Sequence, residues 1–162
     1  MTDKQKDFLR YAVIEQLKYA DIETKLGIKR EIFTPWWDEF KAEREYLARI
    51  RRKWKDKCPE IDFNDFKDWF EKTEKKCHYC DITEHEIEKL WLKYPNLTKR
   101  NRGKSLEIER KKPNKPYNIT ENLVFSCYWC NNAKTDTFTE LEFKKIGNSI
   151  KKIWKARLND NG

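Results

Sequence analysis

The chain has 162 residues and a formal net charge of +8; 40% of its residues are charged and 14% are aromatic. This length allows one compact domain with a small appendage or with extensions, and the aromatic content excludes a disordered polar chain. No apolar run reaches the length of a bilayer span and the first residues lack a signal-peptide core, so we expect a cytoplasmic protein with no membrane partner. The basic balance favours a polyanionic partner, above all nucleic acid.

Residues 1–57 are predicted to form a helical region. Residues 4–17 carry apolar side chains near helical spacing, and a short amphipathic helix, a glycine turn and a second short helix follow them. This order resembles a helix-turn-helix, in which Lys25, Lys29 and Arg30 would contact DNA phosphates. The same apolar residues would also build a plain three-helix packing unit, so a scaffold role is the alternative.

A long basic helix is predicted to follow and to end before Pro59. Thr34 is a good helix cap, and proline is tolerated at the first helical position, which Pro35 would occupy. One face of this helix is apolar, and its other faces carry many lysine and arginine side chains. These cations suit either a solvated surface or contacts with phosphates.

Residues 58–162 are predicted to form the second region, in which capping residues mark the helix starts. A Thr followed three residues later by Glu forms a capping box, and Asp is a good cap by itself. The start signals are Asp62, Thr83 with Glu86, and Thr139 with Glu142. The apolar face expected for the last helix consists of Phe143, Ile146, Ile150, Ile153 and Trp154.

The five cysteines suit metal binding better than a disulfide framework. Four of them form two Cys-x-x-Cys pairs, Cys77 with Cys80 and Cys127 with Cys130. Thiolates suit zinc, and two such pairs complete a closed tetrahedral site, so we expect one structural Zn²⁺ ion per chain. We expect the remaining cysteine, Cys58, to be a small buried residue at the end of a helix.

Between the two cysteine pairs the sequence predicts two short strands. Leu106 and Ile108 alternate with Glu107 and Glu109, which is the period of a half-buried strand with two carboxylates on its open face. A turn region rich in proline and asparagine leads to the apolar segment 123–125, a second strand. The Asn-Asn-Ala-Lys run after the last cysteine can open a helix. Together these elements make a compact ββα unit.

Three short segments of this region form one pattern: Ile-Glu109-Arg110, Glu121-Asn122-Leu, and Cys127-x-x-Cys130-Asn131-x-x-Lys134. The pattern resembles the HNH (ββα-metal) nuclease family, in the branch braced by four zinc-binding cysteines. The resemblance implies that Glu109 and Asn131 hold a catalytic Mg²⁺ or Mn²⁺ ion and that Asn122 fixes the loop that orients the general base. Arg110 and Lys134 would offset negative charge in the transition state.

The sequence departs from the family at the position of the general base. The family usually has histidine after the strand acid, whereas this chain has Arg110, whose guanidinium does not accept a proton near neutral pH. Four sources of a base stay open: His85 from a neighbouring helix, Tyr117 in the loop, Glu107, or a water that gives its proton to the substrate.

A basic segment leads directly into the acidic strand. It carries four cations in six residues, which suits a clamp on the phosphate backbone; a solvated loop is the alternative. These cations are Lys99, Arg100, Arg102 and Lys104.

The sequence therefore predicts a mostly helical α+β protein: an N-terminal helical region, helix-turn-helix-like, and a zinc-braced ββα-metal nuclease core. The predicted function is a metal-dependent DNA endonuclease that hydrolyses phosphodiester bonds, with double-stranded DNA as partner. A homodimer is compatible with this prediction. The alternative function is a non-catalytic zinc-containing DNA-binding regulator.

Overall fold

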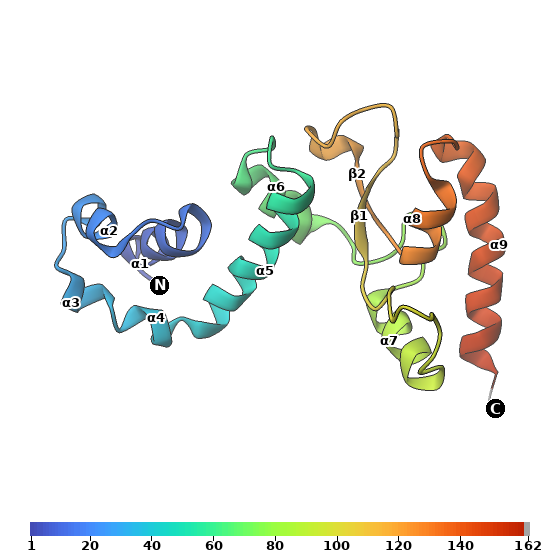
Figure 1. Ribbon diagram of the computed structural model, residues 1–162, viewed down its shortest axis with the longest axis horizontal. Helices are drawn as coiled ribbons and strands as arrows, with labels where there is room; N and C mark the ends of the chain where they lie inside the picture. The colour runs from blue at the N-terminus through green and yellow to red at the C-terminus, as the bar shows by residue number, and fades with distance from the viewer. Residues whose placement is uncertain (161–162) are drawn as a thin grey trace. The chain divides into compact units, whose positions relative to one another are not determined.

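The computed structural model describes residues 1–160, and the chain forms two compact units that divide after Pro59. The first unit is helical throughout its regular structure (Figure 1). Its first helix, α1, continues into a π-helical turn, η1, which ends at Gln16 with a left-handed φ of 55°. The elements of the first unit are α1 (Asp3–Leu9), η1 (Arg10–Glu15), α2 (Tyr19–Leu26), α3 (Arg30–Phe33), α4 (Trp36–Glu39) and α5 (Lys41–Lys57).

The first unit has an apolar core of its own. Phe8 is fully buried, and its ring centroid lies 5.5 Å from that of Phe33 and 5.8 Å from that of Trp36. Helix α5 is tied to η1 because Arg51 Nε donates to the carbonyl of Ile14 at 2.8 Å. The buried members of this core are Phe8, Leu9, Val13, Ile22, Leu26, Phe33 and Phe40.

Two elements of the first unit differ from the sequence prediction. The long helix expected after Thr34 and Pro35 is interrupted at Phe40, whose φ of −101° and ψ of 38° separate α4 from α5. Phe40 is one of the buried core residues, so the helix is interrupted at the residue whose ring packs into the core. The second helix of the predicted helix-turn-helix, α3, is a single turn of four residues.

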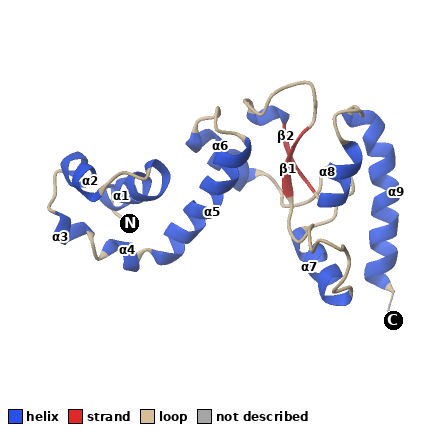
Figure 2. Ribbon diagram, viewed as in Figure 1, coloured by secondary structure: helices blue, strands red, loops and turns tan. Residues whose placement is uncertain are grey.

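The second unit combines a two-stranded antiparallel sheet with helices, as the mostly helical α+β prediction requires (Figure 2). Ile108 pairs with Phe125 and Glu109 with Val124 in the register of the sheet. The elements are α6 (Phe63–Lys72), α7 (Glu84–Lys93), β1 (Glu107–Arg110), the 3₁₀ turn η2 (Thr120–Asn122), β2 (Leu123–Ser126), α8 (Tyr128–Lys134) and α9 (Glu140–Asn159). Among helices of residues 1–160, none has the combined length and apolar composition that spanning a membrane requires.

The helix starts of the second unit follow the predicted capping residues. The Asp62 side chain accepts the N–H of Asn64, and the complete capping boxes at Thr83 and Thr139 open α7 and α9. Helix α8 begins earlier than expected, at Tyr128, because the Cys127 side chain caps it. The predicted starts of α6, α7 and α9 are confirmed, and they were predictable because each depends on residues within one turn of the chain.

Helix α9 does not bury the face that the sequence predicts. Phe143 and Trp154 are buried, but Ile146 and Ile153 are 38% and 50% exposed. The centre of the buried face is Gly147, where a Cβ atom would lie 2.4 Å from the carbonyl oxygen of Tyr79. Glycine inside a helix costs about 0.5–1 kcal/mol relative to alanine, and here it lets the helix contact the backbone between the first two cysteines.

We expect the substitution Gly147→Ala to destabilise the second unit by about 1–3 kcal/mol, because the added methyl group meets backbone that cannot move aside. Urea unfolding followed by circular dichroism measures this change. The matched control is Ser149→Ala, two residues away on the same helix and exposed, which should leave stability within about 0.5 kcal/mol. A Gly147→Ala protein as stable as the wild type would contradict the close contact.

Candidate metal centre and active site

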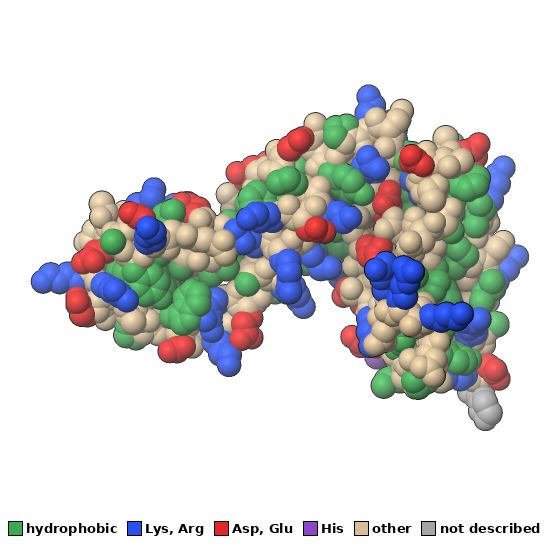
Figure 3. All heavy atoms as spheres, viewed as in Figure 1, with side chains coloured by type: hydrophobic (Ala, Val, Ile, Leu, Met, Phe, Trp, Pro, Cys, Tyr) green, Lys and Arg blue, Asp and Glu red, His purple; other side chains and the backbone are tan. Residues whose placement is uncertain are grey.

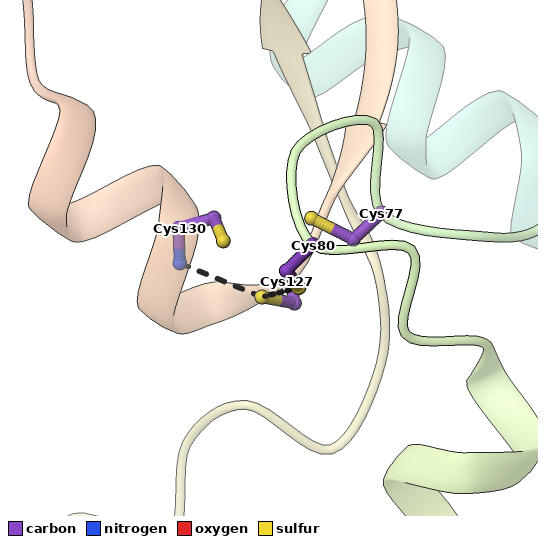
Figure 4. Close-up of side chains that lie close together, drawn as sticks. All are labelled: Cys77, Cys80, Cys127 and Cys130. Carbon is purple, nitrogen blue, oxygen red and sulfur yellow. Dashed lines mark hydrogen bonds between the residues drawn. The ribbon is translucent and has the colours of Figure 1, made fainter. Parts of the chain in front are cut away.

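Four cysteine side chains converge where α8 begins (Figure 4). Cys77 and Cys80 lie in a tight turn before α7, in which Asp81 has a left-handed φ of 60° and donates its N–H to the carbonyl of Cys77. The Sγ atom of Cys127 accepts the N–H of Cys130 at 3.5 Å. All four side chains are buried, and their Sγ atoms lie within 4.8 Å of one another.

The geometry of this cluster fits a bound metal ion. Sulfur atoms that bind zinc tetrahedrally at about 2.3 Å lie about 3.8 Å apart, and the Sγ atoms of Cys80 and Cys127 are 3.6 Å apart. Hydrogen bonds with Cys127, Cys130 and Cys80 lower the pKa of Cys77, whereas the pKa values of Cys127 and Cys130 are raised, so the fit to a metal ion rests on the positions of the sulfur atoms. A metal held by all four thiols would have no open position, so its role would be structural.

The two carboxylates of β1 share the face of the sheet that α8 covers. Side chains alternate along a strand, so Glu107 and Glu109 lie on one face while Ile108 lies on the other with Phe125, its partner in the register. On that apolar face the Trp69 ring of α6 stacks on Phe125 with centroids 5.0 Å apart. The prediction of an open carboxylate face is wrong for Glu109, which is only 7% exposed.

A buried lysine from α8 compensates the charge of Glu109. Lys134 is fully buried; its Nζ atom lies 3.8 Å from Glu109 Oε1 and donates to the carbonyl of Arg110 at 3.2 Å. Burial lowers the pKa of Lys134, and the negative charge of Glu109 opposes that shift. Lys134 therefore joins the end of β1 to α8 as well as balancing the carboxylate.

Asn131, one helical turn before Lys134, contacts the other carboxylate of the strand. Its Nδ2 atom donates to Glu107 Oε2 at 2.6 Å. Residues three apart on a helix share a face, so Asn131 and Lys134 reach Glu107 and Glu109 respectively. The partner of Asn131 was not predicted, because only the packing of α8 on β1 decides which carboxylate the amide meets.

The loop after β1 folds back over the strand end through Arg110 and Tyr117. The guanidinium of Arg110 lies over the Tyr117 ring, 4.6 Å from its centroid, and its Nη1 atom donates to the carbonyl of Lys115 at 3.2 Å. The Tyr117 hydroxyl donates to Glu109 Oε2 at 3.4 Å. The Nε atom of Arg110 is buried and has no hydrogen-bond acceptor among the described residues.

Asn122 holds the same loop from its other side. This side chain is buried; its Oδ1 atom accepts the N–H of Lys112 at 2.9 Å, and its Nδ2 atom donates to the carbonyls of Lys112 and Pro116. One amide thus joins three backbone groups on two stretches of the loop. These contacts have the geometry that a loop clamp requires.

The two histidines of the chain lie next to glutamates other than Glu107 and Glu109. His78 Nε2 lies 2.6 Å from Glu140 Oε1, and His85, on the exposed side of α7, lies 3.8 Å from Glu88 Oε2. In the part of the chain that the structure describes, hydrogen bonds and ion pairs connect neither histidine with Glu109. The sequence allows His85 as a general base, but its exposed position gives this role no support.

The predicted DNA-contacting cations divide between the two units, and all are exposed. In the first unit, Lys25 lies over the Tyr11 ring and Arg30 over the Tyr19 ring, at 5.3 and 5.0 Å from the centroids. In the second unit, Lys and Arg side chains gather in front of the segment between α7 and β1 (Figure 3). The predicted cations are Lys25, Lys29 and Arg30 in the first unit and Lys99, Arg100, Arg102 and Lys104 in the second.

The basic segment 99–104 is anchored to neighbouring helices. Trp91 Nε1 on α7 donates to the carbonyl of Gly103 at 3.0 Å, and Thr98 Oγ1 both donates to the carbonyl and accepts the N–H of Arg102. Gly103 has a φ of 87°, and a Cβ atom there would lie 3.0 Å from the Cβ of Tyr128. The segment is therefore a positioned loop, not a freely solvated one.

A comparison with solved structures finds the rare-cutting HNH restriction endonuclease PacI, with 25% sequence identity and a TM-score of 0.49. The similarity covers 59% of this chain and 65% of that chain, less than two thirds of its length. No protein-family model matches the sequence, and no curated protein matches it. We therefore argue function from the geometry of this chain.

We expect the purified protein to carry one tightly bound metal ion per chain, which elemental analysis measures. Cys127→Ser should remove that ion and unfold much of the second unit, because a structural site of this kind contributes roughly 10–16 kcal/mol of apparent binding energy. Cys58→Ser is the matched control: Cys58 is equally buried, and burial raises its pKa to about 12, so it stays a thiol. Wild-type protein free of metal, purified without chelator, would contradict the site.

Proposed function

We propose that the second unit is a metal-dependent DNA endonuclease of the HNH type. The observation that carries the proposal is the polar layer between β1 and α8, in which Glu107 and Glu109 face Asn131 and Lys134. A strand acid opposite a helix asparagine, next to a loop clamped by Asn122, is the arrangement that the family resemblance implies. On this proposal the chain hydrolyses phosphodiester bonds of double-stranded DNA.

Two different metal ions fit the two parts of the site. The four buried thiolates suit Zn²⁺ in a structural role. Glu109 and Asn131 offer hard oxygen atoms, which suit Mg²⁺ or Mn²⁺. When bound there, the divalent ion would polarise the scissile phosphate and stabilise the leaving oxygen. Glu107 accepts the Nδ2 hydrogen of Asn131, which orients the amide so that its oxygen stays available as a ligand.

Arg110 and Lys134 place positive charge beside the reacting group. The ammonium group of Lys134 lies 3.8 Å from Glu109 Oε1 and offsets the negative charge of that carboxylate. The Nε–H of Arg110 is buried without a protein acceptor among residues 1–160, and a movement of the loop after β1 would let it donate to a phosphate oxygen. Donors fixed in advance where negative charge develops lower the barrier most effectively.

Of the four sources of a general base, Tyr117 has the strongest support. Its hydroxyl lies against Glu109, where the attacking water would bind, and the Arg110 guanidinium over its ring stabilises negative charge on the phenol. Glu107 is engaged with Asn131, and the imidazole of His85 is exposed. Tyr117 would take the proton of the water as the oxygen attacks phosphorus, and it would pass its own hydroxyl proton to Glu109 Oε2, to which it donates.

DNA affinity is proposed to come from the two groups of cations. The positioned loop 99–104 would contact phosphates beside the active site, and Lys25, Lys29 and Arg30 would add contacts from the first unit. The alternative function is a non-catalytic zinc-containing DNA-binding regulator. One observation favours it: Glu109 already has a buried lysine partner, an arrangement that an inert structural ion pair would share.

We expect Glu109→Ala and Asn131→Ala to abolish Mg²⁺- or Mn²⁺-dependent nicking of plasmid DNA, because each removes a metal ligand. Structural metal content and DNA affinity should stay near wild-type values, since the thiol cluster and the cations are unchanged. Glu121→Ala is the matched control, because this exposed carboxylate lies on η2 outside the polar layer. Wild-type protein that cuts no DNA with any divalent metal would favour the regulator.

Variants of the loop identify the base in the same assay. Tyr117→Phe should slow cleavage by about 10²–10⁴-fold, the usual contribution of a general base, whereas His85→Ala should cleave like wild type. Arg110→Ala should lower the rate by about 10²–10³-fold, because charge stabilisation of the transition state is removed. The substitution Arg110→His introduces the histidine that is usual at this position in the HNH family. When it is combined with Tyr117→Phe, the double variant should recover cleavage activity. Unimpaired cleavage by Tyr117→Phe would exclude the tyrosine.

We expect the cations of the loop 99–104 to set the salt dependence of DNA binding. Replacing Lys99, Arg100, Arg102 and Lys104 with glutamine should flatten the slope of log affinity against log salt by about 0.9 for each phosphate that the variant no longer neutralises. Fluorescence anisotropy at several salt concentrations measures this slope.

The matched control for this slope is the double substitution Lys67→Gln and Lys72→Gln on α6, where both ammonium groups are paired with carboxylates. Its slope should equal that of wild type. If the loop variant and wild type show the same salt dependence of DNA affinity, the loop 99–104 does not contact DNA phosphates.

A further inference from the structure

Helix α9 exposes an apolar stripe that nothing in the second unit covers among the described residues. Ile146, Ile150 and Ile153 are spaced four and three apart, so they lie along one face. Ile146 and Ile153 are 38% and 50% exposed, and Ile150 is half-buried. In Figure 3, hydrophobic side chains are visible over this helix at the margin of the molecule. The buried face, centred on Gly147, lies to one side of this stripe.

The two ends of the stripe carry opposite charges at matching distances. Glu142 lies four residues before Ile146, and Arg157 lies four residues after Ile153. Both side chains are exposed. Hydrogen bonds from Thr139 lower the pKa of Glu142, so its carboxylate is ionised at neutral pH. The midpoint of this pattern of charged and apolar residues falls between Ser149 and Ile150. The small side chain of Ser149 would allow two helices to approach closely there.

This symmetry makes the stripe complementary to itself. If two α9 helices cross in opposite directions at the midpoint, Ile146 of each copy lies opposite Ile153 of the other. The same crossing places Glu142 of each copy opposite Arg157 of the other. A two-fold interface requires one patch to complement itself in this way. The lysines next to the stripe turn away from it, since neighbouring helix residues point about 100° apart.

We propose that α9 is a dimerisation surface and that its occupant is α9 of a second copy of this chain, packed antiparallel about a two-fold axis. The contact is small, because a helix of twenty residues is about 30 Å long. Interfaces of small area are typically weak or transient, so we expect a dimer that forms reversibly with concentration. The proposal does not depend on the nuclease activity.

Sedimentation velocity over a range of protein concentrations tests the dimer. We expect wild type to shift from monomer to dimer as concentration rises, and Ile153→Lys to stay monomeric at all of them. Leu141→Lys is the matched control: Leu141 is 77% exposed on the same helix but lies off the stripe, so this variant should dimerise like wild type. A monomeric wild type, or a dimer that survives Ile153→Lys, would overturn the proposal.

A charge exchange tests the antiparallel register separately. Glu142→Arg and Arg157→Glu should each weaken the dimer by about tenfold or more, because each brings like charges together at both ends. An equimolar mixture of the two variants should associate again, because opposite charges then meet in the mixed dimer. Circular dichroism checks that Glu142→Arg, which loses its capping box, keeps α9 folded. Folded variants whose mixture stays monomeric would exclude this register.

Discussion

Four buried thiols join segments of the second unit that lie 47 residues apart in the chain, and the small sheet depends on that connection. Two four-residue strands are marginal by themselves in water. The turn that carries the first cysteine pair is hydrogen-bonded to β2, from the His78 N–H to the carbonyl of Phe125. Helix α9 closes on this turn at Gly147. A metal ion bound by the four thiols would thus position both the sheet and the helices around it.

The polar layer between β1 and α8 is costly for stability, a cost that the proposed metal-dependent chemistry would explain. Burying an ion pair such as Glu109 with Lys134 removes two charges from water, and such pairs often contribute little net stability. The lowered pKa of Lys134 reflects this desolvation. An apolar pair of similar volume would pack the layer without that penalty. A buried carboxylate, an amide and a cation kept together are what metal-assisted phosphate chemistry uses.

The two units divide the candidate functional features between them. The first unit builds its own core from aromatic and aliphatic side chains and contributes exposed cations. The second unit holds the thiol cluster, the polar layer and the anchored basic loop. A dimer through α9 would bring two such sites together without using the cations or the polar layer. Cleavage of both strands of a duplex requires two attacks, so pairing of sites suits the proposed function.

Features that depend on neighbours along the chain could be predicted from the amino-acid sequence. Capping boxes at Thr83 and Thr139, the cysteine spacing and the alternation around Glu107 and Glu109 are local, so helix starts, the thiol pairs and the strands were predictable. Tertiary structure alone decided the break at Phe40, the close contact at Gly147, the burial of Glu109 and the pairing of Asn131 with Glu107. Each of these features depends on a contact with a residue that is distant in sequence, and local sequence patterns do not predict such contacts.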